Sequence, residues 1–210
     1  MYYPLFVDLR GRRCVVVGGG PLAEAKVAAL LDCGADVAVV SDRVTEHLAV
    51  WAAEGRLRWE ARAFRPADLE GAWLVISAPE DRSVNDAVWG EAQRRRLWVN
   101  AVDDPPHCSF IAPAVFRQGD LVVAVCTSGK APALAVRLRD RFAAQLGPEY
   151  GEFLELAGAV REEINRRVPA FRERAALWYR IVDSDILDLL RRGNREAARA
   201  RLWELVEGAG

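Results

Sequence analysis

Two glycines and an alanine with a defined spacing are the first residues that indicate chemistry. The pattern Gly18-x-Gly20-x-x-Ala23 stands between an apolar run that predicts a buried strand, residues 14–17, and a helical pattern over residues 22–31. In such a pattern the first glycine permits a tight turn, the second lets the backbone approach a pyrophosphate, and the small third residue lets helix and strand pack closely. Because the free N–H groups at the start of the helix face the phosphates, the sequence predicts a dinucleotide site.

An acidic residue after the second predicted strand bears on which dinucleotide is bound. Asp42 follows the apolar run at residues 36–40. A carboxylate at this place accepts hydrogen bonds from the ribose hydroxyls and repels a 2′-phosphate, which favours NAD over NADP. The adjacent Arg43 would tolerate that phosphate, so the preference is moderate. The alternative interpretation is that Asp42 caps the next helix.

A second acidic segment, Asn-Ala-Val-Asp-Asp, follows the fifth predicted strand and ends in Asp103 and Asp104. In an open parallel sheet, ligands bind beyond the carboxyl ends of the strands, so we expect Asp103 to face the nicotinamide side of the site as a general base whose pKa depends on burial and on Asp104. The alternative is a turn or helix cap before the two prolines that follow. His107 is a candidate for moving protons or contacting a metal, although a histidine in a loop often does neither.

A hydroxyl-rich turn is the third candidate site. Thr127 and Ser128 precede Lys130 at the point where a predicted strand gives way to a helix starting at Pro132. Backbone N–H groups, the two hydroxyls and the ammonium group could together hold a substrate carboxylate. The alternative is an ordinary helix cap by Thr127 or Ser128. Lys130 and Lys26 are the only lysines of the chain, and both lie beside glycine turns.

These candidate sites need elements to position them, and the first half of the chain alternates short apolar runs with helical patterns. Further strands are predicted at residues 57–61, 73–78 and 97–100, and further helices from Thr45 to Gly55 and over residues 83–96. This alternation predicts an α/β fold, a Rossmann-type doubly wound parallel sheet covered on both faces.

The pattern changes after Pro105-Pro106, which we expect to stop any regular element. Two apolar runs, residues 110–116 and 121–127, flank Gly119 and predict a hairpin. Because two strands alone are marginal in water, the hairpin must pack on something, for which a second copy of itself is a candidate. From Pro132 onward the patterns are wholly helical.

Composition limits the classes of function. The 210 residues carry 29 basic and 30 acidic side chains, so no overall positive field exists to bind nucleic acid. A hydrophobic content of 51% argues against disorder. No apolar stretch is long enough for a membrane span, no signal peptide is evident, and the four cysteines are too scattered for a metal site or a disulfide framework. We therefore expect a cytoplasmic protein with no metal site.

Four segments in order carry a family resemblance: VVVGGGPLAEAK, SAPEDRSVN, NAVDDPPHCSFIAPAVF and TSGKAPALAVRLR. Together they resemble the precorrin-2 dehydrogenase / sirohydrochlorin ferrochelatase family, which includes the N-terminal module of siroheme synthase. The resemblance starts at YPLFVDLRGR and extends to RAALWYRIVDSD, so it covers essentially the whole chain.

The resemblance implies a three-part architecture. Residues 1–112 would form an NAD-binding Rossmann domain, residues 113–146 a small β dimerisation and substrate segment made of the hairpin and a helix, and residues 147–210 a C-terminal helical domain. It also implies a homodimer in which the hairpin finds its partner in the second subunit.

The resemblance further implies that NAD⁺ oxidises precorrin-2 to sirohydrochlorin, and that some members then insert Fe²⁺ to give siroheme. The family's catalytic aspartate falls on Asp103. Its cofactor contacts fall on the segments Pro21-Leu22 and Asp42-Arg43. A serine is frequent in the family where this chain has Thr127, so the resemblance implies no role that depends on that serine.

Two other functions remain open from the residues alone. One is a non-enzymatic NAD-sensing regulatory module, and the other is an NAD-dependent dehydrogenase of a different small metabolite. Asp103, expected at the nicotinamide end, favours an enzyme. Three arginines of the predicted hairpin and of the helix after Pro132 are candidate partners for the carboxylates of the substrate: Arg117, Arg137 and Arg139.

Overall fold

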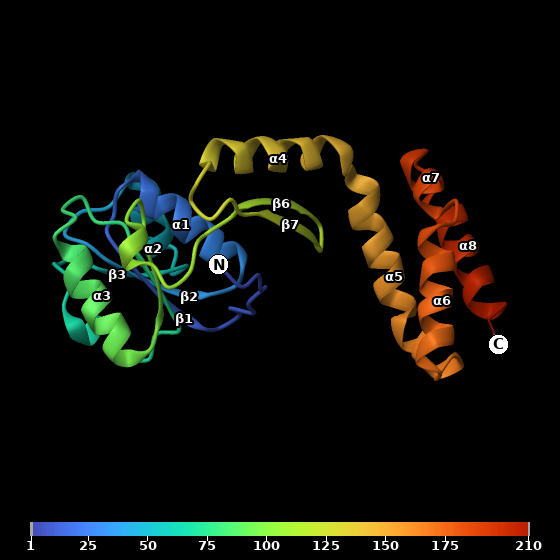
Figure 1. Ribbon diagram of the computed structural model, residues 1–210, viewed down its shortest axis with the longest axis horizontal. Coiled ribbons are helices and arrows are strands. Elements are labelled where there is room, and N and C mark those ends of the chain that lie inside the picture. Colours follow the sequence, from blue (N-terminus) through green and yellow to red (C-terminus); the bar gives the residue numbers. More distant parts are fainter. Residues whose placement is uncertain (1, 210) are drawn as a thin grey trace. The chain divides into compact units, whose positions relative to one another are not determined.

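The computed structural model describes residues 2–209, and the chain divides into two compact units, Met1–Ala112 and Pro113–Gly210. In Figure 1 the first unit contains the larger sheet and helices α1 to α3, and the second contains the hairpin and helices α4 to α8. Each unit has a core of its own.

The first unit is built on a five-stranded sheet in the order β3-β2-β1-β4-β5, in which all neighbouring strands are parallel. The order runs outward in both directions from β1, as in a doubly wound nucleotide-binding fold. The predicted fold class is therefore confirmed. The strands are β1 (Arg13–Val17), β2 (Asp36–Val40), β3 (Arg58–Glu60), β4 (Leu74–Ser77) and β5 (Trp98–Ala101).

Side chains from the central strands enter two separate cores, because successive residues of a strand point to opposite faces. On one face Val16 packs with Val27 of α1 (Pro21–Asp32) and Leu48 of α2 (Glu46–Ala53). On the other face Val15 packs with Val88 of α3 (Val84–Arg95). The valine-rich strands are thus covered on both sides, as their unbroken apolar runs predict.

Two short 3₁₀ turns complete the first unit, η1 (Pro66–Leu69) and η2 (Pro105–His107). The expectation that Pro105-Pro106 stops any regular element is wrong at this point. Both prolines occupy the start of η2, where a backbone N–H would have no acceptor within the turn and its absence costs nothing.

The second unit begins with an antiparallel hairpin of β6 (Ala114–Gln118) and β7 (Leu121–Val125). Helix α4 (Pro132–Gln145) packs against both strands. At the hairpin turn, a Cβ added to Gly119 would lie 3.2 Å from the Cα of Gly151 in α5 (Pro148–Arg167). The hairpin therefore already packs on helices of its own chain, which sequence periodicity alone does not predict.

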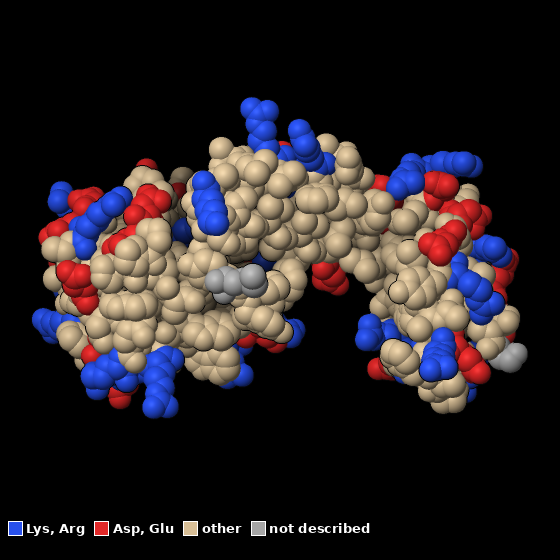
Figure 2. Space-filling model, viewed as in Figure 1, with Lys and Arg blue, Asp and Glu red and all other residues tan. Residues whose placement is uncertain are grey.

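The remaining helices form the second core. They are α5, α6 (Phe171–Val182), α7 (Ile186–Arg191) and α8 (Arg195–Glu207). Buried side chains from all four meet there, among them Val160, Ile181, Ile186 and Leu202. Acidic and basic side chains are interspersed over the exposed face of these helices (Figure 2). No helix within residues 2–209 is both long and apolar enough to cross a membrane.

Candidate active site

The glycine turn lies between β1 and α1, where the motif predicts it. Gly18 has a φ of 113°, in the region that L side chains rarely adopt, and a Cβ on it would lie 2.2 Å from the carbonyl oxygen of Ala78, after β4. The turn is therefore possible only with glycine and is pressed against the carboxyl end of β4. Ala23, fully buried, faces the core at the start of α1.

Gly20 differs from its two neighbours because it faces open space. Apart from its chain neighbours, no described atom lies within 4 Å of the place where its Cβ would be. Gly20 is the N-cap of α1 and Pro21 follows it, so the first-turn N–H groups of Leu22 and Ala23 have no acceptor within the helix. An open approach to backbone N–H groups at a helix N-terminus fits a dinucleotide pyrophosphate.

The loop after β2 is fixed against the same turn through Gly19. A Cβ on Gly19 would lie 2.0 Å from the carbonyl oxygen of Arg43, and the N–H of Thr45 donates to the Gly19 carbonyl at 2.9 Å. The Ser41 hydroxyl in turn donates to the Arg43 carbonyl at 2.7 Å. Gly19 was not singled out by the motif, and the only sequence signal for it is the run of three glycines.

Asp42 lies exposed in this loop and does not cap the next helix. The N-cap of α2 is Thr45, whose hydroxyl accepts a hydrogen bond from the N–H of Leu48 at 3.3 Å. The capping alternative for Asp42 is therefore wrong, and the side chains of Asp42 and Arg43 both remain exposed beside the glycine turn.

A contact between α1 and α2 stabilises the two loops. Glu24 in the first turn of α1 accepts from the imidazole Nδ1 of His47 in α2 at 2.9 Å. Hydrogen bonds from Thr45 and His47 lower the pKa of Glu24 below its usual value. The carboxylate therefore stays ionised and holds the start of α2 to the start of α1.

Asp103 lies in a tight turn at the carboxyl end of β5. The N–H of Asp104 donates to the carbonyl of Ala101, and the N–H of Val102 donates to Ser77 at the end of β4. Asp103 has a φ of 58°, which few residues other than glycine, asparagine and aspartate adopt. Its side chain is exposed and makes no hydrogen bond or ion pair with the described residues. The turn thus shares the edge of the sheet where the Gly18 turn meets β4.

The side chain of Asp104, unlike that of Asp103, is held by hydrogen bonds. Its Oδ2 accepts from the Nδ2 of Asn85 at 3.0 Å and lies 2.8 Å from the Nδ1 of His107. The hydrogen bonds from His107 and then Asn85 lower the pKa of Asp104 despite opposing partial desolvation. The other ring nitrogen of His107, Nε2, lies 3.0 Å from Oδ1 of Asp86. Asn85 was missed because its contact with Asp104 depends on how α3 packs beside β5.

The hydroxyl-rich turn belongs to the second unit, between β7 and α4. The N-cap of α4 is Ala131, and the Thr127 hydroxyl accepts from the Ala131 N–H at 3.3 Å. Thr127 therefore stabilises the turn just before the helix, although it does not occupy the cap position itself. Ser128, with a φ of 55°, and Lys130 are exposed.

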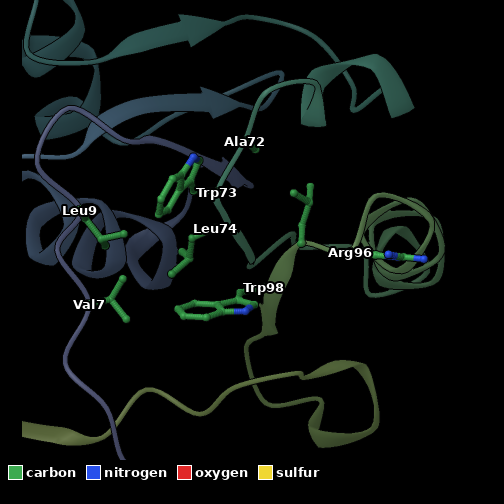
Figure 3. A pocket seen from close by; sticks show the side chains of 8 residues that line it. Val7, Leu9, Ala72, Trp73, Leu74, Arg96 and Trp98 are labelled. Carbon is green, nitrogen blue, oxygen red and sulfur yellow. The ribbon is translucent and has the colours of Figure 1, made fainter.

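A separate hollow of about 250 Å³ lies at the opposite end of the sheet from the glycine turn. Figure 3 shows Val7, Leu9, Trp73 and Trp98 facing this hollow, whereas the guanidinium of Arg96 turns away from it. Trp73 and Trp98 lie at the amino ends of β4 and β5. Ligands of open parallel sheets bind at the carboxyl ends, so this hollow is distinct from the dinucleotide site.

The first unit matches a known family over most of its length. A family model described as "Putative NAD(P)-binding" matches residues 5–114, and one described as "Sirohaem synthase dimerisation region" matches residues 149–206. The chain belongs to the family that the NAD(P)-binding model describes, and its helical region matches the sirohaem synthase dimerisation region. The resemblance drawn from the four sequence segments is thereby confirmed, and so is the nicotinamide dinucleotide as the class of cofactor.

Relatives and a solved structure agree with this membership. A siroheme synthase of Methylobacillus flagellatus is 41% identical over 99% of the chain, and siroheme synthase 1 of Serratia proteamaculans is 37% identical over 98%. The chain spans only 44% and 43% of those two proteins. The solved structure of SirC, a precorrin-2 dehydrogenase, superposes with a TM-score of 0.78 at 25% identity, covering 99% of this chain and 100% of SirC.

The family models bear on the division of the chain in one further way. The dimerisation model falls on helices α5 to α8, whereas residues 115–148, which include nearly all of the hairpin and the whole of α4, lie between the two matches. The expectation that residues 113–146 dimerise stays a prediction. Within residues 2–209, no three His, Cys, Asp or Glu side chains are grouped as a metal site would require.

Proposed function

We propose that this chain is an NAD-dependent dehydrogenase that oxidises precorrin-2 to sirohydrochlorin. The similarity to SirC over the full length of both chains carries the proposal, because it includes the nucleotide unit and the helical unit together. The open approach at Gly20 supports it, since it leaves room for a pyrophosphate at the N-terminus of α1. When bound, NAD⁺ supplies the acceptor for the hydride that leaves the macrocycle.

Asp103 is the residue we assign to the proton that accompanies the hydride. A general base must lie where a substrate proton can reach it, and a carboxylate keeps its basicity only where strong hydrogen bonds do not stabilise its ionised form. Asp103 meets both conditions among the described residues, whereas Asp104 next to it accepts two hydrogen bonds that favour its ionised form and reduce its basicity. His107 was also predicted to take part in catalysis, and we assign to it the task of holding Asp104.

The carboxylates of the tetrapyrrole need cationic and hydroxyl partners. We assign this task to the Thr127–Lys130 turn and to arginines of β6 and α4, because guanidinium groups bind carboxylates through two parallel hydrogen bonds. Arg139 already pairs with Asp140 at 2.5 Å, so Arg137, exposed on the same helix, is the better candidate of these two. We also propose that the active form is a homodimer, which the dimerisation model over residues 149–206 supports.

The decisive experiment is anaerobic incubation of the chain with NAD⁺ and precorrin-2, with sirohydrochlorin and NADH followed by absorbance. We expect turnover, and we expect Asp103→Asn to lower it by about two to four orders of magnitude, the usual range for a lost general base. Asparagine tolerates the same left-handed backbone, so NAD⁺ affinity and thermal stability should not change.

Asp32→Asn at the last turn of α1, away from the glycine turn, serves as the matched control and should keep full activity. Full NAD-dependent turnover in Asp103→Asn would refute the assignment of Asp103. Intact NAD⁺ binding without turnover in the unmodified chain would instead favour a nucleotide-sensing module.

Insertion of Fe²⁺ into sirohydrochlorin is a separate proposal, in which the metal is a substrate. Adding Fe²⁺ to sirohydrochlorin anaerobically, with and without the chain, tests it. A metal-dependent spectral change that is no faster with the chain present would limit the function to dehydrogenation.

The cofactor preference follows from the exposed carboxylate of Asp42. If it accepts the ribose hydroxyls, Asp42→Ala should weaken NAD⁺ binding and narrow the preference over NADP⁺ by about tenfold, or 1.4 kcal/mol. Titrations with both nucleotides give the ratio. An unchanged ratio would show that Asp42 does not contact the ribose.

A further inference from the structure

A line of hydrogen-bonded polar side chains connects β4, α3 and the turn that carries Asp103. The hydroxyl of Ser77 donates to Oδ1 of Asn85 at 2.7 Å, and Nδ2 of Asn85 donates to Oδ2 of Asp104 at 3.0 Å. Ser77 is 1% exposed and Asn85 2% exposed. Because a buried amide that loses a partner is costly, these contacts fix which end of the Asn85 amide faces Asp104.

His107 extends the line and is held between two carboxylates. Its Nδ1 lies 2.8 Å from Oδ2 of Asp104 and its Nε2 lies 3.0 Å from Oδ1 of Asp86. Both contacts are hydrogen bonds only when both ring nitrogens carry a proton. The imidazole of His107 also makes an edge-to-face contact with the ring of Trp89, with the ring centroids 5.8 Å apart, and this contact further limits how the imidazole can rotate.

The backbone around Asp104 is constrained as well. The thiol of Cys108 lies 3.3 Å from the carbonyl oxygen of Asp104 and 3.2 Å from that of Ala101, and the N–H of His107 donates to the Asp104 carbonyl at 3.0 Å. Asp103 is held between these points with its left-handed φ of 58°. Such a conformation persists where the surroundings over-determine it.

We propose that Asn85, Asp104 and His107 are positioning residues, which hold the turn after β5 so that the Asp103 carboxylate meets the proton it removes. The inference rests on the proposed function, because Asp103 is the base only in that reaction. None of the three needs to touch the substrate. A misplacement of the base by about 1 Å is enough to lower a rate on the order of 100-fold.

The test exchanges donor and acceptor between Asn85 and Asp104. Asn85→Asp keeps the size of the side chain and the bond from Ser77, but sets a second acceptor against Asp104. We expect its single-turnover rate of precorrin-2 oxidation to fall by about 10- to 100-fold, with NAD⁺ affinity unchanged. Asp104→Asn alone keeps an amide oxygen that can accept from Asn85 and His107, and its rate completes the double-mutant cycle.

The double variant Asn85→Asp/Asp104→Asn should recover most of the rate lost in Asn85→Asp. The amide introduced at position 104 then donates both to the carboxylate introduced at position 85 and to Nδ1 of His107, while Nε2 donates to Asp86. Recovery shows that the loss in Asn85→Asp comes from the hydrogen bond between positions 85 and 104 and not from an unrelated defect at position 85.

The imidazole protons give a readout that needs no substrate. The chain has only two histidines, so nitrogen-15 spectra contain two ring systems, and His47→Gln identifies the other one. We expect Nδ1 of His107 to be protonated in the unmodified chain and unprotonated in the double variant. An unprotonated Nδ1 in the unmodified chain would overturn the network.

The two proposals fail in different ways. If the chain binds NAD⁺ but leaves precorrin-2 unchanged, the proposed function fails, and the imidazole spectra still decide whether the network exists. If the chain is active but Asn85→Asp keeps the full rate, the positioning role is refuted. It is also refuted if the double variant shows the expected unprotonated Nδ1 of His107 but does not recover the rate.

Discussion

Three consecutive glycines, Gly18, Gly19 and Gly20, meet three different environments. Side chains on Gly18 and Gly19 would collide with carbonyl oxygens of Ala78 and Arg43, whereas one on Gly20 would project into open space. The first two positions therefore shape the turn, and the third keeps an approach to the helix N-terminus free.

At the residue scale, Gly20→Ala separates binding from folding. Gly20 has an extended backbone that alanine adopts, so the free energy of unfolding should change by no more than about 1 kcal/mol, the usual cost of a lost glycine N-cap. A methyl group in the path of the pyrophosphate should weaken NAD⁺ binding by about tenfold or more. Denaturation curves and nucleotide titrations measure the two effects.

Gly19→Ala is the matched contrast. Its methyl group would lie 2.0 Å from the Arg43 carbonyl oxygen, so the loop after β2 must move. We expect a loss of stability of about 1–3 kcal/mol, as for other overpacked positions. Equal losses of stability in both variants would contradict the distinction between a shaping and a binding glycine.

Only some residues of the candidate site could be predicted from the sequence. Gly18, Gly20 and Ala23 were predicted because their roles depend on local geometry between one strand and one helix. The roles of Gly19 and Asn85 depend on Arg43 and Asp104, which come from other elements, and no local pattern encodes those contacts. The catalytic assignment of Asp103 stays a prediction, whereas the hydrogen bonds of its neighbour Asp104 could be seen only in the fold.

At the element scale, the last turn of α3 contains a pH-sensitive ion pair. Glu91, 8% exposed, pairs with Arg94 at 2.6 Å and with Arg95, and these bonds lower its pKa from 4.5 to about 2. A carboxyl whose pKa is lowered by folding stabilises the fold above its unfolded pKa, and this stability is lost as the pH falls through the folded pKa.

Glu91→Gln should therefore reduce stability at neutral pH and flatten its decline between pH 4.5 and 2. Thermal unfolding across this range measures both effects. Glu80→Gln, at an exposed position with no ion pair among the described residues, should leave the decline as it is. A decline as steep in Glu91→Gln as in the unmodified chain would contradict the ion-pair explanation.

Two glycines of α5 give a second test of elements packing together. Gly158 is exposed, and beyond the backbone of its own helix an added Cβ would meet open space, so Gly158→Ala should stabilise the helix by about 0.5–1 kcal/mol. At Gly151 the same methyl group would lie 3.2 Å from the Gln118 carbonyl at the hairpin turn. Gly151→Ala should therefore destabilise by about 1 kcal/mol, and urea unfolding compares the two. An equal gain in stability in both variants would mean that the hairpin turn can move away from the added methyl group at no cost.

At the scale of the whole molecule, the sequence pattern changes after residue 104, and this change predicted an α/β domain followed by a hairpin and helices. The helical stripes correctly placed most of α5 to α8, because their apolar residues recur at helical spacing. Periodicity could not predict which elements pack against the hairpin. Helix α4 contacts β6 and β7, and Gly151 contacts the turn between these strands. The sequence pattern of each element alone does not predict which face of the hairpin a helix covers.

The same hairpin is one candidate surface for a homodimer. Its two strands pair only with each other within the described residues, and unpaired strand edges are ready to pair with a second chain. Val115 and its cross-strand neighbour Ala124 are both exposed. Phe171, at the start of α6, is 77% exposed and offers a competing contact in the region that the dimerisation model matches.

We expect light scattering after size exclusion to give twice the 23.3 kDa of one chain. Val115→Asp should shift the population toward the monomer, because a desolvated carboxylate opposes burial of the hairpin, whereas Phe171→Asp should leave the dimer intact. If Phe171→Asp alone dissociates it, the helices hold the dimer and the hairpin is covered by its own chain. A monomer in the unmodified chain would refute the homodimer itself, while nucleotide binding by the first unit would still be open to the Gly20→Ala test.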